Sequence, residues 1–132
     1  MGTIVVGYVP RPEGAAALTA GIEEARLRGS RIVLVSSYRG GSDYDAGAAR
    51  EAENELQQVR TQLAESGVDH EVRHLIRGFE PAEDVLAIAE TEHADLIVIG
   101  LRHRTPVGKL LMGSNAQRVL LDATCPVLAV KA

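Results

Sequence analysis

Apolar and polar positions recur along the chain with two different periods, and these periods predict alternating strands and helices. Short runs that are rich in β-branched residues and apolar on both faces are typical of strands covered on both sides. Longer stretches with an apolar stripe at helical spacing predict amphipathic helices. The predicted strands are residues 3–8, 31–38, 68–76, 95–100 and 127–130. The predicted helices follow the first four strands and end near residues 28, 66, 93 and 122.

This order of elements predicts a single α/β domain that spans residues 1–132. Because the crossovers between parallel strands are right-handed, strict alternation of strand and helix indicates a doubly wound parallel sheet. The third predicted strand alternates apolar with polar residues, as in Glu71, Val72 and Arg73. Half-buried alternation of this kind favours a position at an edge of the sheet.

The most distinctive stretch of the chain follows the fourth predicted strand. The apolar run 96–99 ends at Gly100, and Gly113 comes directly before Ser114 and Asn115, where the fourth helix is predicted to start. Ser and Asn are favoured N-cap residues, so we expect the helix to begin here. The loop between these points contains the basic residues Arg102, His103, Arg104 and Lys109. Such a junction suits a phosphate, because the first N–H groups of a helix lack partners and carry partial positive charge; the same residues are also ordinary turn chemistry.

The charge distribution favours binding of an anionic ligand over the alternative that these residues only form an ordinary turn. The chain has 14 Lys and Arg, 18 Asp and Glu and a formal net charge of -4, yet no carboxylate lies between Asp95 and Asp122. A basic loop in an acidic chain is a local anion-attracting field. Glu80, Glu83 and Asp84 are interpreted as favourable charges at a helix start. An aromatic content of 3% argues against a nucleic-acid module that stacks bases.

The single cysteine and the N-terminal sequence indicate a soluble cytoplasmic protein. Cys125 has no partner for an internal disulfide and no neighbouring His and Asp constellation, so we expect an inert thiol. Gly2 and Thr3 lead directly into an apolar strand, without the pattern of a signal peptide. No apolar run reaches membrane-spanning length.

Together these features resemble the universal stress protein family over essentially the whole chain. Nucleotide-binding members carry Gly, two residues, Gly, nine residues, Gly and then Ser or Thr after the fourth strand. Gly100, Gly113 and Ser114 occupy matching positions, and the sequence LLMGSNAQRVLLDATCPVLAV at residues 110–130 is similar to the family's. The resemblance implies an adenine nucleotide alpha hydrolase-like fold with four helices and five strands in the order 3-2-1-4-5.

The resemblance also implies a ligand and a partner. It predicts a stress-response or regulatory protein that binds ATP or another adenine nucleotide, with no metal inferred. The residues expected around the phosphates are Gly100, Arg102, Gly113, Ser114 and Asn115, with Ser37 near the base. A homodimer is implied in which the last strand pairs antiparallel with its copy through Val127, Leu128, Ala129 and Val130. No nucleic acid or membrane partner is expected.

Two positions in the expected binding site depart from the ATP-binding pattern and leave a second function open. His103 stands where the pattern has its second glycine, so a side chain occupies the space that would let the loop backbone approach phosphate. Val9 stands where ATP-binding members have Asp, which removes a partner for ribose or adenine. The alternative is therefore a dimeric interaction protein of the same fold that has lost its ligand. An enzyme that cleaves the nucleotide is least favoured, because the loop offers no general base or metal-binding carboxylate.

Overall fold

The structure, a computed structural model, describes residues 1–38, 46–76, 80–102 and 113–132. The strands are β1 (Thr3–Tyr8), β2 (Arg31–Tyr38), β3 (His70–Ile76), β4 (Leu96–Leu101) and β5 (Val127–Lys131). The helices are α1 (Pro12–Arg28), α2 (Ala46–Ser66), α3 (Pro81–Thr91) and α4 (Ser114–Asp122). All nine predicted elements are therefore confirmed, and most of their boundaries lie within about two residues of the predicted ones.

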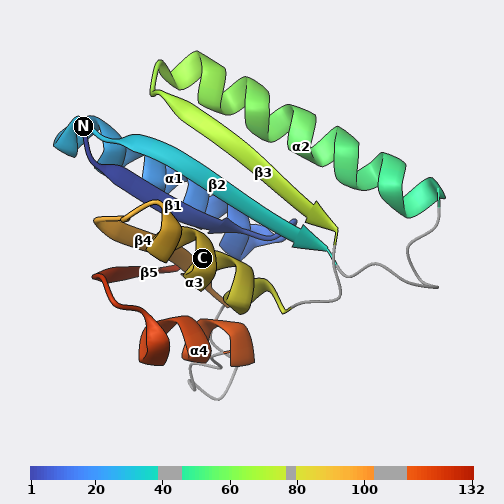
Figure 1. Ribbon diagram of the computed structural model, residues 1–132. Coiled ribbons are helices and arrows are strands. Elements are labelled where there is room, and N and C mark those ends of the chain that lie inside the picture. Colours follow the sequence, from blue (N-terminus) through green and yellow to red (C-terminus); the bar gives the residue numbers. More distant parts are fainter. Residues whose placement is uncertain (39–45, 77–79, 103–112) are drawn as a thin grey trace.

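The strands form one parallel sheet in the order β3-β2-β1-β4-β5 (Figure 1). This order confirms the predicted topology and places the half-polar β3 at an edge. It also makes β1 and β4 neighbours, with Val5 opposite Ile97 in the register. Because the chain winds away from β1 in one direction and reaches β4 in the other, the topological switch point lies between these two strands.

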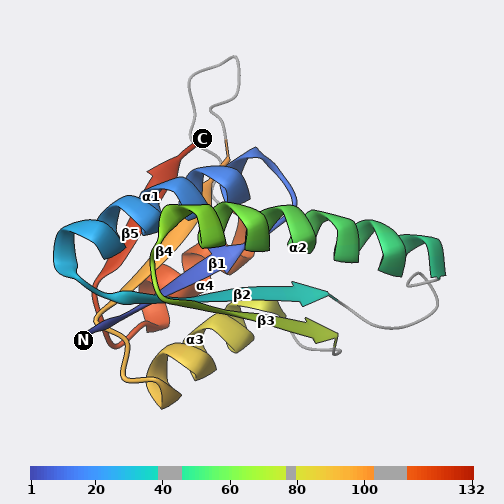
Figure 2. The same cartoon turned by 90° about the horizontal axis from the view of Figure 1, so that it is seen from above.

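Helices cover both faces of the sheet, as the doubly apolar strands require (Figure 2). On one face, Ile4 and Val6 of β1 pack against α1 and α2 in a core that includes Leu18 and Leu63. On the other face, Val5 of β1 belongs to a core with residues of α3 and α4. On α2, the apolar residues Leu56, Val59 and Leu63 are all 4% exposed or less.

Ion pairs connect the C-terminal end of α3 to the sheet. Glu92, directly after α3, pairs with Arg31 on β2 at 3.0 Å and also with Arg73 on β3. Hydrogen bonds and charge from Arg73 and Arg31 hold the pKa of Glu92 below its ordinary value. These contacts fix α3 against β2 and β3, so its N-terminal turn is held beside the carboxyl ends of the central strands.

Cys125 is half-buried between α4 and β5, and burial raises the pKa of its thiol. A raised pKa keeps the less reactive thiol form, which agrees with the expected inert residue. Within the described ranges, no helix is long and apolar enough to cross a membrane.

Candidate functional site

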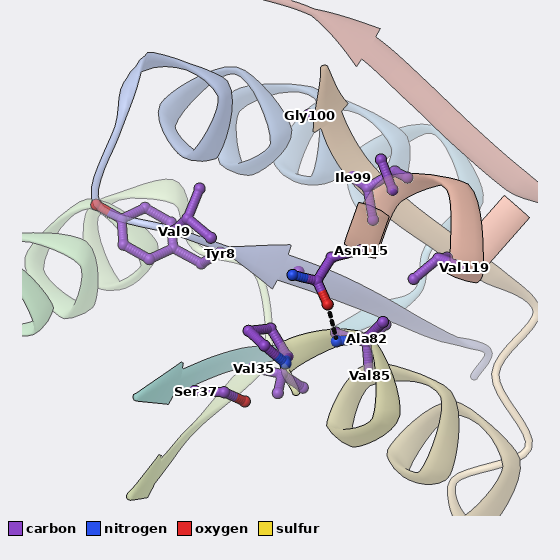
Figure 3. Close-up of a pocket in the computed structure, with 13 residues that line it drawn as sticks. Tyr8, Val9, Val35, Ser37, Ala82, Val85, Ile99, Gly100, Asn115 and Val119 are labelled. Atoms are coloured by element: carbon purple, nitrogen blue, oxygen red, sulfur yellow. Dashed lines mark hydrogen bonds between the residues drawn. The ribbon is translucent and has the colours of Figure 1, made fainter. Parts of the chain in front are cut away.

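A pocket lies at the carboxyl ends of β1 and β4, where the topology predicts ligand binding (Figure 3). Its walls come from the ends of β1, β2 and β4 and from the N-terminal turns of α3 and α4. The apolar lining consists of Val9, Val35, Pro81, Ala82, Val85, Ile99, Ala116 and Val119. The cavity volume is about 90 Å³, several times the roughly 10–15 Å³ needed by one water, so a ring-sized group can enter.

One wall of this pocket is formed by β2 and α3, and Ser37 supplies a polar group to that wall. Its Oγ donates a hydrogen bond of 2.7 Å to Oδ2 of Asp84 in the first turns of α3. Asp84 is 7% exposed and does not line the cavity itself. The expectation that Asp84 serves only as a favourable charge at a helix start was therefore incomplete, because its carboxylate also accepts a bond from the sheet.

Asn115 supplies the polar group on the opposite wall. Its Oδ1 accepts a hydrogen bond of 3.1 Å from the backbone N–H of Ala82, the second residue of α3. A backbone N–H can only donate, so the oxygen of the amide must face α3 and the amide NH₂ must face the other way. Figure 3 shows this nitrogen directed over the pocket toward the side where Tyr8 and Val9 lie.

The helix α4 begins at Ser114, as predicted, but its N-cap is not one of the residues expected from the sequence. Gly113 is the N-cap, Ser114 is the first helical residue, and no side chain caps this helix within the described structure. Asn115 was expected to cap its own helix but caps α3 instead, 33 residues away in sequence. The first N–H groups of α4 therefore have no acceptor within their own helix.

A second cavity adjoins the first at the start of α4 and has a different character. It shares Val9, Gly100, Asn115 and Ala116 with the apolar pocket. It is lined in addition by Arg11, Glu13, Leu101, Arg102, Gly113 and Ser114. Two exposed arginines and one glutamate thus line a cavity at the positive end of a helix dipole. An apolar compartment and a cationic compartment therefore lie side by side and share these four lining residues.

Close backbone contacts hold the two compartments in place. A Cβ at Gly100 would lie 1.8 Å from the carbonyl oxygen of Glu13, and a Cβ at Gly14 would lie 1.7 Å from that of Val9. Only glycine permits this approach between the end of β4, the β1–α1 turn and the start of α1. Gly100, which was expected at the phosphates, therefore has a packing reason to be glycine as well.

The structure brings together most of the residues that the sequence singled out. Val9, Gly100 and Asn115 line both compartments, Ser37 lines the apolar one, and Arg102, Gly113 and Ser114 line the cationic one. His103, with Arg104 and Lys109, lies outside the described residues. Asp84 and Arg11 were not predicted as site residues. Arg11 could have been found from its place directly after the first strand, whereas no local pattern pairs Asp84 with Ser37.

The described residues contain no group of three or more His, Cys, Asp or Glu side chains that could hold a metal ion. The polar groups of the pocket are instead a serine hydroxyl, a carboxamide and backbone N–H groups. These groups can bind and orient a ligand through hydrogen bonds.

Comparisons with known proteins show relatives of similar sequence and fold. A universal stress protein of Mycolicibacterium smegmatis is 45% identical over 128 residues, which cover 97% of this chain and 96% of that protein. The structure of a universal stress protein from Archaeoglobus fulgidus is similar with a TM-score of 0.83 and 35% identity, covering 99% of this chain and 98% of that chain. Another from the same organism, in complex with dAMP, has a TM-score of 0.75 and 30% identity, covering 99% and 98%.

The structural likenesses confirm the adenine nucleotide alpha hydrolase-like fold. The sequence model of the Universal stress protein family matches residues 1–131. The chain therefore belongs to the universal stress protein family.

Proposed function

We propose that this protein binds an adenine nucleotide, with the base in the apolar compartment and the phosphates in the cationic one. The observation that carries the proposal is that the two compartments adjoin and share Val9, Gly100, Asn115 and Ala116 as lining residues. A nucleotide has the same division into an apolar ring and an anionic tail. The similar Archaeoglobus fulgidus protein in complex with dAMP supports the same class of ligand.

The cationic compartment suits a phosphate through both charge and geometry. Arg11 and Arg102 lie in its lining, and the first N–H groups of α4 follow Gly113 at the same cavity. A Cβ at Gly113 would lie 3.9 Å from the Arg102 guanidinium, so this cation lies close to the helix start. Guanidinium and backbone N–H groups together form charge-assisted bonds to phosphate oxygens.

Val9 changes the contact expected on the ribose side. It lines both compartments, so an apolar side chain lies where the nucleotide's sugar would bridge them. The phosphates and the base therefore supply the binding free energy, and we propose that a 2′-deoxynucleotide binds about as well as its ribonucleotide.

Calorimetry with AMP, dAMP and ATP tests the proposal, with Arg102→Ala as the diagnostic variant. A hydrogen bond to a charged group contributes about 1.5–3 kcal/mol; because Arg102 is exposed, the lower figure applies and predicts roughly tenfold weaker binding. Arg28→Ala is the matched control, because Arg28 is an exposed arginine at the end of α1 that pairs with Glu24. An absence of heat from every nucleotide at millimolar concentration would favour the ligand-free interaction protein.

A second part of the proposal is that β5 pairs antiparallel with its copy to form a homodimer. β5 is the outer strand of the sheet, and its residues Val127 to Val130 are half-buried in the single chain. An uncovered apolar edge strand promotes aggregation, and a two-fold axis covers it with one self-complementary surface. We propose a stress-response role in the cytoplasm, which the family name and the single cysteine support.

A further inference from the structure

We propose that Asp84 sets the hydrogen-bond polarity of Ser37, so that the pocket selects a base with an amino group over one with a keto group. This inference rests on the proposed binding of a nucleotide and adds the feature of the base that is recognised. Ser37 would contact the ligand, whereas Asp84 would act through Ser37 as a positioning residue.

The position of Ser37 assigns it to the base end of the ligand. Ser37 lines the apolar compartment only, while Arg11 and Arg102 line the cationic compartment only. A nucleotide with its phosphate at the arginines would therefore direct the far edge of its base toward Ser37. In a purine this far edge carries the substituent at position 6.

The contact with Asp84 determines what Ser37 can offer. A serine hydroxyl has one proton to donate and two lone pairs that accept. The proton is directed to Oδ2 of Asp84 over 2.7 Å, and an ionised carboxylate only accepts. Asp84 is 7% exposed, so water cannot readily replace Ser37 as its donor. Ser37 is therefore left with lone pairs alone for the ligand.

A hydroxyl limited to accepting discriminates at position 6 between adenine and hypoxanthine, which differ at that position and in the proton that hypoxanthine carries on N1. The 6-amino group of adenine donates to Ser37, whereas the 6-keto oxygen of hypoxanthine faces the same lone pairs without a proton between them. A neutral hydrogen bond contributes about 0.5–1.5 kcal/mol, and an unpaired buried acceptor costs about 1–3 kcal/mol. We expect AMP to bind at least tenfold more tightly than IMP.

Calorimetry of AMP and IMP with three variants tests this assignment. In Asp84→Asn the new carboxamide can donate a hydrogen bond to Ser37 as well as accept one. The Ser37 hydroxyl can then turn its own proton toward the ligand and donate it to the keto oxygen of IMP. The ratio of AMP affinity to IMP affinity should therefore fall toward one. Ser37→Ala should also bring the ratio toward one, by weakening AMP. Ser37→Thr keeps the hydroxyl and should keep the ratio. Asp69→Asn, at an exposed position before β3, is the matched control and should leave the ratio unchanged.

The outcomes separate this inference from the proposed function. Equal binding of AMP and IMP by the unchanged protein would overturn the inference and leave nucleotide binding intact. An unchanged ratio in folded Asp84→Asn would overturn the role of Asp84, and an unchanged ratio in Ser37→Ala would overturn that of Ser37. Binding of neither nucleotide would overturn the proposed function and the inference together. Circular dichroism of each variant verifies that the fold is retained.

Discussion

Replacing Asn115 in two ways separates its contribution to stability from its contribution to binding. Its Oδ1 accepts the N–H of Ala82 at the start of α3, and its NH₂ is directed over the pocket. Asn115→Ala removes both functions. Loss of a helix cap costs about 0.5–2 kcal/mol. An unfolding entropy of about 2.1 cal/mol/K per residue over 132 residues converts 1 kcal/mol into a Tm change of about 4 °C, so the expected fall in Tm is about 2–7 °C.

Asn115→Asp keeps the acceptor and removes the donors. Its carboxylate would still cap α3 and would interact favourably with the positive end of that helix, so Tm should stay within about 2 °C of the original. A negative charge at the junction of the compartments would, however, repel a phosphate-bearing ligand, and we expect AMP to bind at least tenfold more weakly. Asn115→Ala should weaken AMP binding by about two- to tenfold, from the loss of one neutral hydrogen bond.

Thermal unfolding and AMP calorimetry on the two variants measure these effects separately. Each variant serves as the control for the other, because both remove the amide NH₂ and only Asn115→Asp keeps the acceptor for α3. If Asn115→Asp lost as much stability as Asn115→Ala, the carboxamide oxygen would not be acting as the α3 cap. If Asn115→Asp bound AMP as tightly as the unchanged protein, the amide would not face the ligand.

Three further predictions concern the scaffold, the dimer and pH. Gly100→Ala should destabilise the fold by about 1–3 kcal/mol in denaturant unfolding, because its Cβ would lie 1.8 Å from the Glu13 carbonyl oxygen; an unchanged midpoint would refute that contact. Ala129→Pro should yield a monomer in light scattering. The hydrogen bond from the Ile97 N–H to the Pro126 carbonyl sets a register in which the Ala129 N–H faces away from β4, toward the position of a partner strand. Proline removes this N–H without breaking a bond to β4. A persistent dimer would place the interface elsewhere. Burial lowers the pKa of His74, so the unfolded chain binds its proton more readily; stability should fall as pH drops below about 6.5, and less so in His74→Gln. Equal pH dependence in both proteins would exclude His74 as the cause.

The elements and their order were predictable because each depends on a local pattern. Runs such as Ile4 to Val6 are apolar on both faces, and the half-polar β3 indicated its own place at the edge. The first helix was predicted to end near residue 28, and Gly29 ends α1 there with a φ of 64°. The Val9, Gly100 and Asn115 region was also predictable, because the carboxyl ends of neighbouring parallel strands lie together.

The hydrogen bonds that give the site its polarity were not predictable from local patterns. Asn115 lies at a helix start, and that pattern favours a cap on its own helix; its true partner belongs to α3. Asp84 lies in the first turns of a helix with Glu83, where negative charge is favourable in any case, so nothing in the sequence pointed to Ser37, 47 residues away. Contacts of this kind depend on how the helices pack on the sheet.

The most direct test of the central claim is amide chemical-shift mapping by NMR with the two halves of the ligand offered separately. Inorganic pyrophosphate should shift the amides of Arg102, Gly113 and Ser114, and adenosine should shift those of Ser37 and Val85. AMP should shift both groups at a lower concentration than either fragment requires. Shifts from AMP that avoid both groups, or that spread to the exposed surface of α2, would contradict a nucleotide site at the carboxyl ends of β1 and β4.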